Sequence, residues 1–417
     1  MADVSPLHAL HYALNRVGGL QPVVAPPYDV IDAAQRAELA ARSPYNVVEI
    51  DLPQGDGDRY AHASRRFEAW QRDGVITRDP EPALWALAQG YTGPDGRSYT
   101  RRGIFARVRV EDYGPGRIRP HERTHPGPRE DRLRLTRATR ANLSPIFSLY
   151  DDPGGAAWSA ISPHTERAPW AQLTDDDGTE HRLWRVGDAD AAAAVGATLR
   201  DTELLIADGH HRYETARVYA EEMGGEGAHR HVLMCLVALQ DPGLTVFPTH
   251  RLLTGLSEAR REALREAIAR DWEVEEVPPE HLQPVGDGRL RVGYLDAGHR
   301  RPQMLTLRDP AIADAALSGK PEPYRRLDTA VLEALILQGA LGMTEDDISR
   351  LDGLEYARST EQARERVQAG AAEAAFFMAP TPVERVRDVA AAGETMPPKS
   401  TYFYPKVLTG MVFHPLT

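Results

Sequence analysis

The sequence is poor in features that mark several protein classes. Its single cysteine, Cys235, excludes an internal disulfide and a cysteine-rich zinc site, and it fits a reducing compartment. No segment approaches the ~18 consecutive apolar residues that a membrane-spanning helix needs. The first 16 residues also lack the cationic and apolar regions of a secretion signal. We therefore expect a cytoplasmic protein with no membrane partner.

The chain also has fewer basic residues than acidic residues. The 49 Lys and Arg residues face 61 Asp and Glu residues, which gives a formal net charge of -12 at pH 7. Such a field repels nucleic acid, so we expect no nucleic-acid partner, whereas a small anion in a local basic pocket remains compatible with it. The length of 417 residues predicts two or three domains.

The most informative segment is the apolar run that starts at Leu204 and stops at Asp208-Gly209, directly before His210-His211-Arg212. The pattern predicts a buried strand, a tight reversal at Gly209 and a helix that starts at His210. A helix N-terminus favours phosphate, and the guanidinium of Arg212 matches phosphoryl oxygens. Adjacent histidines diverge on a helix, so at most one of them faces the anion. The alternative is an ordinary turn in which Asp208 caps the helix.

Residues His121-Glu122-Arg123-Thr124-His125 spell H-E-x-x-H, the zinc-protease signature. That motif binds zinc only on a continuous helix, and the prolines at 120, 126 and 128 argue against one. We expect no stoichiometric zinc. Glu122 sits among arginines and histidines in an irregular loop, where it is either a general base for a hydroxyl or a surface ion-pair partner.

Two further segments carry polar side chains suited to phosphate or to substrate. Lys399-Ser400-Thr401 follows a diproline and lacks the glycines of a Walker A loop, yet its ammonium and hydroxyls can contact phosphates. The alternative is a solvated terminal loop. His250-Arg251 ends an apolar strand and is a weaker candidate of the same kind.

The periodicity predicts these elements: helices over 32–42, 58–74, 129–141 and 381–392; strands over 46–52, 145–150 and 374–378; a hairpin of 83–91 with 98–112; and a second hairpin of 231–239 with 244–252.

Several of these segments resemble known families. Asp208-Gly209-His210-His211-Arg212 is similar to the phosphate-binding turn of the ParB/sulfiredoxin superfamily, and most closely to that of the free serine kinases. Pro120-His121-Glu122 resembles the loop that carries the catalytic carboxylate of those kinases. The whole chain resembles domain of unknown function family 1015 (DUF1015), in Pro26-Pro27-Tyr28-Asp29-Val30, the Asp208 turn, Pro248-Thr249-His250-Arg251 and Pro397 to Thr401.

The resemblance implies an α+β fold with a ParB/sulfiredoxin-like core over 101–252, in which 151–195 is an insertion. An N-terminal α+β domain over 1–100, a helical and mixed insertion domain over 253–364 and a C-terminal segment over 365–417 that completes the active site would be added to this core. The region 253–364 shows no recognisable chemistry.

The same resemblance implies phosphoryl transfer between ATP or ADP and a small hydroxy amino acid, with L-serine or phosphoserine as the leading substrate. Glu122 would be the base, assisted by Asp208, His210 and His211. Gly209, Arg212, Lys399, Ser400 and Thr401 would bind phosphates. His121, Arg123, His250 and Arg251 would bind the amino acid, and Asp208 would hold Mg²⁺ or orient the turn.

Two alternatives stay open at this point. A ParB-like nucleotide-binding regulatory or DNA-associated protein would share the turn, but it should add a basic face. A zinc-dependent hydrolase would need His121 and His125 on one helix. The sequence leaves open the direction of transfer and whether the chain forms a homo-oligomer.

Overall fold

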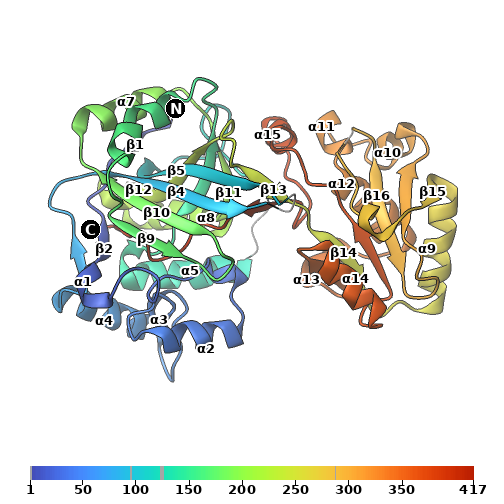
Figure 1. The fold of residues 1–417 in the computed structure, drawn as a ribbon, viewed down its shortest axis with the longest axis horizontal. Coiled ribbons are helices and arrows are strands. Elements are labelled where there is room, and N and C mark those ends of the chain that lie inside the picture. Colours follow the sequence, from blue (N-terminus) through green and yellow to red (C-terminus); the bar gives the residue numbers. More distant parts are fainter. Residues whose placement is uncertain (1, 94–95, 123–125, 287) are drawn as a thin grey trace. The chain divides into compact units, whose positions relative to one another are not determined.

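A computed structural model describes residues 2–93, 96–122, 126–286 and 288–417, without the side chains of 126–128. The chain divides into two compact units (Figure 1). The first contains Met1–Pro120, Thr124–Leu244 and Pro405–Thr417, and the second contains His121–Arg123 and Thr245–Tyr404. The predicted division into the segments 1–100, 101–252, 253–364 and 365–417 stays a prediction.

The first unit is built on a large mixed sheet, which has nine strands in the described residues. The strands are, in spatial order, β6 (Ile118–Arg119), β11 (Leu204–Asp208), β8 (Ile146–Tyr150), β12 (His231–Ala238), β5 (Ser98–Arg109), β4 (Leu84–Thr92), β10 (Glu180–Val186) and β9 (Ala171–Thr174), with β1 (Val4–Ser5) on β5. Two short ladders accompany it: β2 (Leu10–Tyr12) with β3 (Ile76–Arg78), and β7 (Ala141–Asn142) with β21 (His414–Pro415).

The first unit also contains helices. They are α1 (Leu14–Val17), α2 (Ala33–Arg42), α3 (Val48–Asp51), α4 (Arg59–Arg72), α5 (Pro126–Thr139), α6 (Ala156–Ile161), α7 (Ala189–Leu199) and α8 (His210–Met223). In Figure 1, α7 and α5 lie on opposite sides of the sheet. Apolar side chains of α6, α7 and α8 pack with alternate residues of β4 and β5, such as Ala86 and Ala106, because successive strand residues point to opposite faces.

The second unit contains a sheet of six strands in its described part, and all of the pairs in this sheet are antiparallel. The order is β15 (Trp272–Glu276), β17 (Gln303–Leu307), β16 (Arg291–Asp296), β19 (Ala374–Phe377), β14 (His250–Leu253) and β18 (Leu354–Ala357), and β13 (Thr245–Phe247) pairs separately with β20 (Tyr402–Tyr404). The helices are α9 (Glu258–Asp271), α10 (Pro310–Ala316), α11 (Glu322–Arg325), α12 (Asp328–Leu332), the π-helix η5 (Glu333–Ala340), α13 (Glu345–Arg350), α14 (Thr360–Gln368) and α15 (Val383–Ala391).

Most of the predicted elements are present. Asp32 caps α2 by accepting a hydrogen bond from Gln35 N, and Asp58 caps α4 by accepting from Tyr60 N and Ala61 N. The first hairpin is confirmed by the pairing of β4 with β5, although residues 94–95 of its turn lie outside the described residues. The predicted mixture of helices and strands is therefore confirmed, and the ParB/sulfiredoxin-like core with added domains stays a prediction.

The strand predicted over 46–52 is wrong, because this segment contains the short helix α3. Asn46 accepts a hydrogen bond from Val48 N at 3.1 Å and donates to Pro22 O at 2.9 Å. Val48 and Ile50 are both buried. A short apolar run is ambiguous between helix and strand, and here the tertiary contacts of Asn46 decide the outcome.

The prediction of a second hairpin, formed by 231–239 and 244–252, is also wrong. After β12 the chain turns at 240–243, but the next apolar run forms two strands, β13 and β14, that pair with β20, β18 and β19. Pro248 divides this run because proline cannot donate a ladder hydrogen bond. The chain therefore leaves the first unit after Leu244 and enters the second.

Helix α5 starts at Pro126, three residues earlier than predicted, because proline is tolerated in the first turn of a helix. Within the described residues, none of the helices combines the length and the hydropathy that crossing a lipid bilayer requires.

Candidate functional site

The turn between β11 and α8 has the predicted backbone. The strand is buried from Leu204 to Ala207, and α8 begins at His210. Gly209 between them has a φ of 95°, the left-handed conformation that glycine adopts without steric cost. A Cβ at this position would lie 2.9 Å from Arg212 Nε, so the side chain of Arg212 lies tightly against the turn. The residue at the N-cap position of α8 is Gly209, so Asp208 does not occupy the cap position that the alternative assigns to it.

Asp208 lies between two cations. Its Oδ2 accepts a hydrogen bond from Arg212 Nη2 at 2.5 Å, and its Oδ1 accepts one from Lys406 Nζ at 2.9 Å. Burial by itself would raise the pKa of Asp208, but the charges of Lys406 and Arg212 outweigh burial and hold this pKa far below its usual range. Asp208 is therefore a carboxylate at neutral pH, and this group of three side chains carries a net charge of about +1.

Arg212 is more enclosed than the sequence predicts. Its side chain is 9% exposed. Nη1 donates to Ser144 Oγ at 2.8 Å and to the carbonyl oxygen of Pro145, while Nη2 binds Asp208. These contacts hold the Arg212 side chain in place, and through it they stabilise the turn. The predicted contact of Arg212 with phosphate stays a prediction.

The sequence reasoning missed Lys406. Two signals pointed to it: Lys320, Lys399 and Lys406 are the only lysines of the chain, and Lys406 lies in an otherwise apolar terminal segment. Its position is set by hydrogen bonds to its backbone. Gln89 Nε2 donates to Lys406 O at 2.9 Å, and Arg101 Nη2 donates to Pro405 O at 2.5 Å.

Arg101 has further hydrogen bonds that hold it in place beside Pro405. It is 1% exposed and donates to Gln89 Oε1 through both Nε and Nη2. Burial lowers the pKa of Arg101 to about 10. A buried guanidinium is costly unless it is well bonded, so this network fixes the backbone from which Lys406 reaches Asp208.

The two histidines of the turn differ in exposure. His210 is buried and His211 is half-buried. The positive form of His210 would also lower the pKa of Asp208. Their predicted roles in catalysis stay predictions.

In the second unit, Glu122 lies next to His121, with 3.9 Å between Glu122 Oε1 and His121 Nε2. His121 is buried and is held at both ends: its Nε2 lies 2.9 Å from Thr401 Oγ1, and its carbonyl oxygen accepts from Met396 N at 2.7 Å. The Glu122 side chain is 28% exposed. A substrate can therefore reach a carboxylate whose neighbour is rigidly fixed.

Arg251 belongs to the same part of the second unit. It is buried, donates to Thr249 O at 2.5 Å and to Pro398 O at 3.4 Å, and stacks over the ring of Tyr356. Burial lowers the pKa of Arg251, against the opposing charges of Tyr356, Glu333 and Glu122. Glu333 begins the π-helix η5, in a region where the sequence showed no chemistry. Single π-helical turns are frequent at functional sites.

His250 does not share the environment of Arg251. It is fully buried, its Nδ1 accepts from Met378 N at 3.1 Å, and its Nε2 lies 3.3 Å from Thr360 Oγ1. Burial and the neighbouring Arg251 lower the pKa of His250 to about 4, so the ring is neutral at physiological pH. These contacts favour a structural role over the predicted substrate contact.

The three residues of the segment 399–401 also differ in exposure and in contacts. Lys399 is exposed and has a φ of 56°, which is uncommon for a residue other than glycine. Ser400 is buried and donates to Pro397 O at 2.7 Å and to Thr329 Oγ1 at 3.0 Å, so its hydroxyl shapes the loop. Thr401 contacts His121. Among these three residues, Lys399 is the one whose side chain extends into solvent.

The predicted site residues thus fall into two groups. Asp208 to Arg212 lie in the first unit, whereas His121, Glu122, His250, Arg251 and 399–401 lie in the second. Arg123 and His125 lie outside the described residues.

Among the residues that the structure describes, no group of three or more His, Cys, Asp or Glu side chains is arranged to hold a metal ion. Around Asp208 the neighbours are cations, which disfavour a second cation and support the predicted role of orienting the turn. Magnesium binding by Asp208 stays a prediction.

A large cleft in the first unit involves other residues. Its volume is about 1540 Å³, and no predicted site residue lines it. Arg109, Arg117, Arg217, Glu111 and Glu214 are among its lining residues. This mixture of positive and negative side chains does not favour one class of ligand. We therefore define the candidate site by the contacts of the Asp208 turn and of Glu122, and not by the size of a cleft.

Comparison with known proteins gives one family and several structures. The profile of the family described as "Protein of unknown function (DUF1015)" matches residues 4–330. A free serine kinase in complex with AMP is 15% identical, with 74% of this chain and 92% of that chain aligned and a TM-score of 0.38. A conserved hypothetical protein from Pyrococcus furiosus is 14% identical, with 74% and 95% aligned and a TM-score of 0.36. SbnI from Staphylococcus aureus with a C-terminal truncation is 12% identical, with 75% and 87% aligned and a TM-score of 0.38. No curated protein sequence matches the chain.

Proposed function

The chain belongs to the DUF1015 family, and we propose that it transfers a phosphoryl group between a nucleotide and a small hydroxy amino acid, with free L-serine as the leading substrate. The Asp208 turn carries this proposal. A helix of 14 residues starts there after a glycine reversal, and Lys406 and Arg212 lie at the same carboxylate. The positive end of a helix and a net positive side-chain group both favour phosphate.

In this proposal Lys406 makes the charge contact with the nucleotide phosphates, and Asp208 and Arg212 hold the turn in shape. The Lys406 side chain is 16% exposed and the Arg212 side chain is 9% exposed, so the lysine is the more accessible cation. Lysine acts on phosphate as a point charge that needs no fixed orientation. A divalent cation such as Mg²⁺ would offset part of the polyphosphate charge when the nucleotide binds.

Glu122 is the proposed general base. It removes the proton of the substrate hydroxyl while the hydroxyl oxygen forms a bond to the transferred phosphorus. The bond from that phosphorus to the nucleotide oxygen breaks, and the nucleotide leaves with the electron pair. In the reverse direction the protonated Glu122 returns the proton to the same oxygen.

Arg251 is the proposed partner of the amino-acid carboxylate. It is buried, and the charges of Glu333 and Glu122 raise its pKa against the effect of burial. A guanidinium in such a position suits a carboxylate, with which it makes charge-assisted hydrogen bonds. The preference for serine follows the resemblance of the Asp208 turn and of Pro120-His121-Glu122 to the free serine kinases.

The proposal is tested by measuring product formation. The purified protein is incubated with L-serine or phosphoserine and with AMP, ADP or ATP, with and without Mg²⁺, and the products are identified by mass spectrometry. The proposal predicts phosphoserine from serine, or serine from phosphoserine, with the matching change in the nucleotide. Nucleotide binding without turnover on any hydroxy amino acid would instead favour a nucleotide-binding regulatory protein.

A further inference from the structure

Three buried polar side chains form a row across the large sheet of the first unit. Gln89 on β4 lies directly opposite His181 on β10 and directly opposite Arg101 on β5. All three residues are buried. Residues that are opposite each other on neighbouring strands point to the same face, which here is the face away from Ala86. We call these three residues the polar row. Buried polar groups cost free energy unless they are hydrogen-bonded, so the partners of the row matter.

Gln89, in the middle of the row, uses the whole hydrogen-bonding capacity of its amide. Its Oε1 accepts from Nε and Nη2 of Arg101, at 3.1 and 2.5 Å. Its Nε2 donates to Lys406 O at 2.9 Å and lies 3.3 Å from His181 Nδ1. A reversed amide would turn its NH₂ group toward the donors of Arg101 and its oxygen toward Lys406 O. The partners of Gln89 therefore permit one orientation of this amide.

That orientation determines which ring nitrogen of His181 carries the hydrogen. Gln89 Nε2 is a donor only, so His181 Nδ1 accepts and the hydrogen lies on Nε2. His181 Nε2 then donates to Asp175 Oδ2 at 2.7 Å. The other oxygen of Asp175 accepts from the backbone N–H groups of Asp177 and Thr179, at 3.0 and 2.9 Å, in the turn between β9 and β10. Asp175 is thereby fixed, and it fixes the His181 ring.

The polar row holds the chain on which Lys406 lies. Arg101 Nη2 donates to Pro405 O, and Gln89 Nε2 donates to Lys406 O, so two successive carbonyl groups are bound by neighbouring members of the row. If His181 did not accept from Gln89, a buried N–H group of that amide would lose its partner. The amide would then gain by rotating, at the expense of its bond to Lys406 O.

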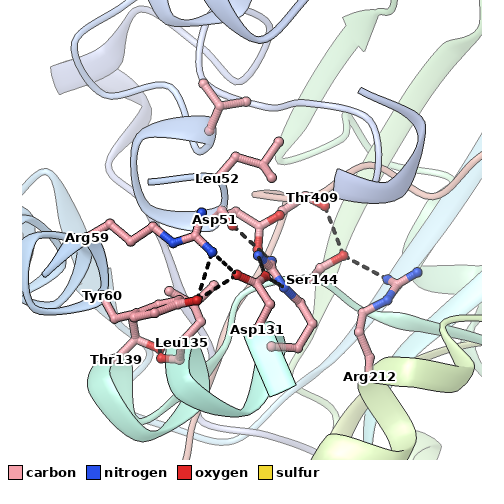
Figure 2. Close-up of polar contacts among 12 residues, drawn as sticks. Asp51, Leu52, Arg59, Tyr60, Asp131, Leu135, Thr139, Ser144, Arg212 and Thr409 are labelled. Atoms are coloured by element: carbon pink, nitrogen blue, oxygen red, sulfur yellow. Dashed lines mark hydrogen bonds and ion pairs between the residues drawn. The ribbon is translucent and has the colours of Figure 1, made fainter. Parts of the chain in front are cut away.

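The terminal segment that the row holds meets the Asp208 turn at two points. Lys406 Nζ donates to Asp208 Oδ1 at 2.9 Å. Thr409 Oγ1 donates to Ser144 Oγ at 2.9 Å, and the same oxygen accepts from Arg212 Nη1, as Figure 2 shows. A shift of this segment would therefore change the surroundings of both charged side chains of the turn.

We propose that His181 and Asp175 are positioning residues for Lys406. They hold the amide of Gln89, and through it the backbone from which the Lys406 ammonium reaches Asp208 and the nucleotide phosphates. The effect on phosphate rests on the proposed function, whereas the effect on the contact between Lys406 and Asp208 does not.

Two substitutions of His181 separate the acceptor from the size of the side chain. His181→Asn keeps an oxygen close to the place of Nδ1, whereas His181→Leu removes the acceptor. Calorimetric titration should show ADP binding about 3- to 10-fold weaker in His181→Leu, the scale of one hydrogen bond, and changed by less than about 2-fold in His181→Asn. Asparagine leaves more empty space than leucine, so a purely structural role predicts the larger loss in His181→Asn. His62→Leu on α4, an exposed histidine of the same unit, is the matched control and should bind as the wild type does.

A double variant shows whether His181 acts through Lys406. In Lys406→Met the ammonium is absent, so His181→Leu should weaken ADP binding no further. The same pair is compared by urea unfolding without nucleotide, where the combined effect on the unfolding equilibrium constant should be at least about 3-fold smaller than the product of the single effects. Absence of ADP binding by the wild type would overturn the proposed function, and the unfolding comparison would still decide the role of His181.

Nitrogen-15 NMR of the wild type at about pH 7.5 gives a readout that needs no variant, and it should find the His181 proton on Nε2. Three results would each overturn the proposal: a proton on Nδ1, unfolding effects of His181→Leu and Lys406→Met that multiply independently, or an equal loss of ADP affinity in His181→Asn and His181→Leu.

Discussion

At the scale of single residues, Glu122 decides whether the chain is an enzyme. Glu122→Gln keeps the size of the side chain but cannot accept a proton, so kcat and kcat/KM should both fall by about 10²–10⁴. Nucleotide affinity should barely change. If Glu122 only makes surface ion pairs, turnover stays intact and stability changes by at most ~1 kcal/mol. Glu384→Gln on α15, an exposed glutamate of the same unit, is the matched control.

Lys406 tests the phosphate contact more cleanly than Arg212, because Arg212→Ala would also remove a buried brace. Lys406→Met should weaken ADP and ATP binding by about 1.5–3 kcal/mol, the scale of hydrogen bonds to charged groups. Calorimetric titration measures this loss. Lys320→Met removes a lysine that is paired with Glu394 at 2.9 Å in the second unit, and it should bind nucleotide as the wild type does. Equal affinities in all three proteins would contradict the phosphate role of Lys406.

Asp208 should make stability depend on pH in the acid range. Its pKa in the folded chain lies far below the value of about 3.9 in an unfolded chain. The ionised carboxylate therefore stabilises the fold fully above pH ~4, and this contribution is lost as the pH falls toward the folded-state pKa.

Asp208→Asn tests this dependence, because it leaves Arg212 and Lys406 without their shared carboxylate. It should cost about 3–5 kcal/mol at pH 7, as breaking a buried ion pair does, and less at pH 3. Urea unfolding at both values measures the difference. The same loss at pH 3 and pH 7 would show that the ion pairs do not stabilise the fold.

At the scale of elements, the turn from β11 to α8 depends on Gly209. Alanine there has an unfavourable positive φ, and its Cβ would meet Arg212 Nε at 2.9 Å. Gly209→Ala should lower the free energy of unfolding by about 1–3 kcal/mol and weaken nucleotide binding. Gly224→Ala at the other end of α8 also has a positive φ, but no atom lies within 4 Å of its Cβ, so it should cost stability alone. Normal nucleotide affinity in Gly209→Ala would separate the turn from binding.

At the scale of the whole molecule, the net charge of -12 opposes polyanion binding. Labelled duplex DNA should show no change in fluorescence anisotropy with the protein at about 150 mM salt, with or without ATP. Saturable, ATP-dependent binding would instead support the ParB-like, DNA-associated alternative.

The sequence by itself determined the features that depend on neighbouring residues. The apolar run from Leu204, the left-handed Gly209 and the helical start at His210 form one local unit, so the backbone of the Asp208 turn was predictable. The caps at Asp32 and Asp58 were predictable for the same reason, because a cap bonds within its own first turn.

Only the tertiary structure decided which distant side chains meet that turn. Lys406 lies 198 positions after Asp208, and no local pattern records that its backbone is held by Arg101 and Gln89. The second apolar run after β12 has the composition of a hairpin strand, yet its partners are strands 100 residues or more away. Strand pairing and ion pairs between remote residues depend on how the whole chain returns on itself, whereas periodicity and turn chemistry report only a few neighbours.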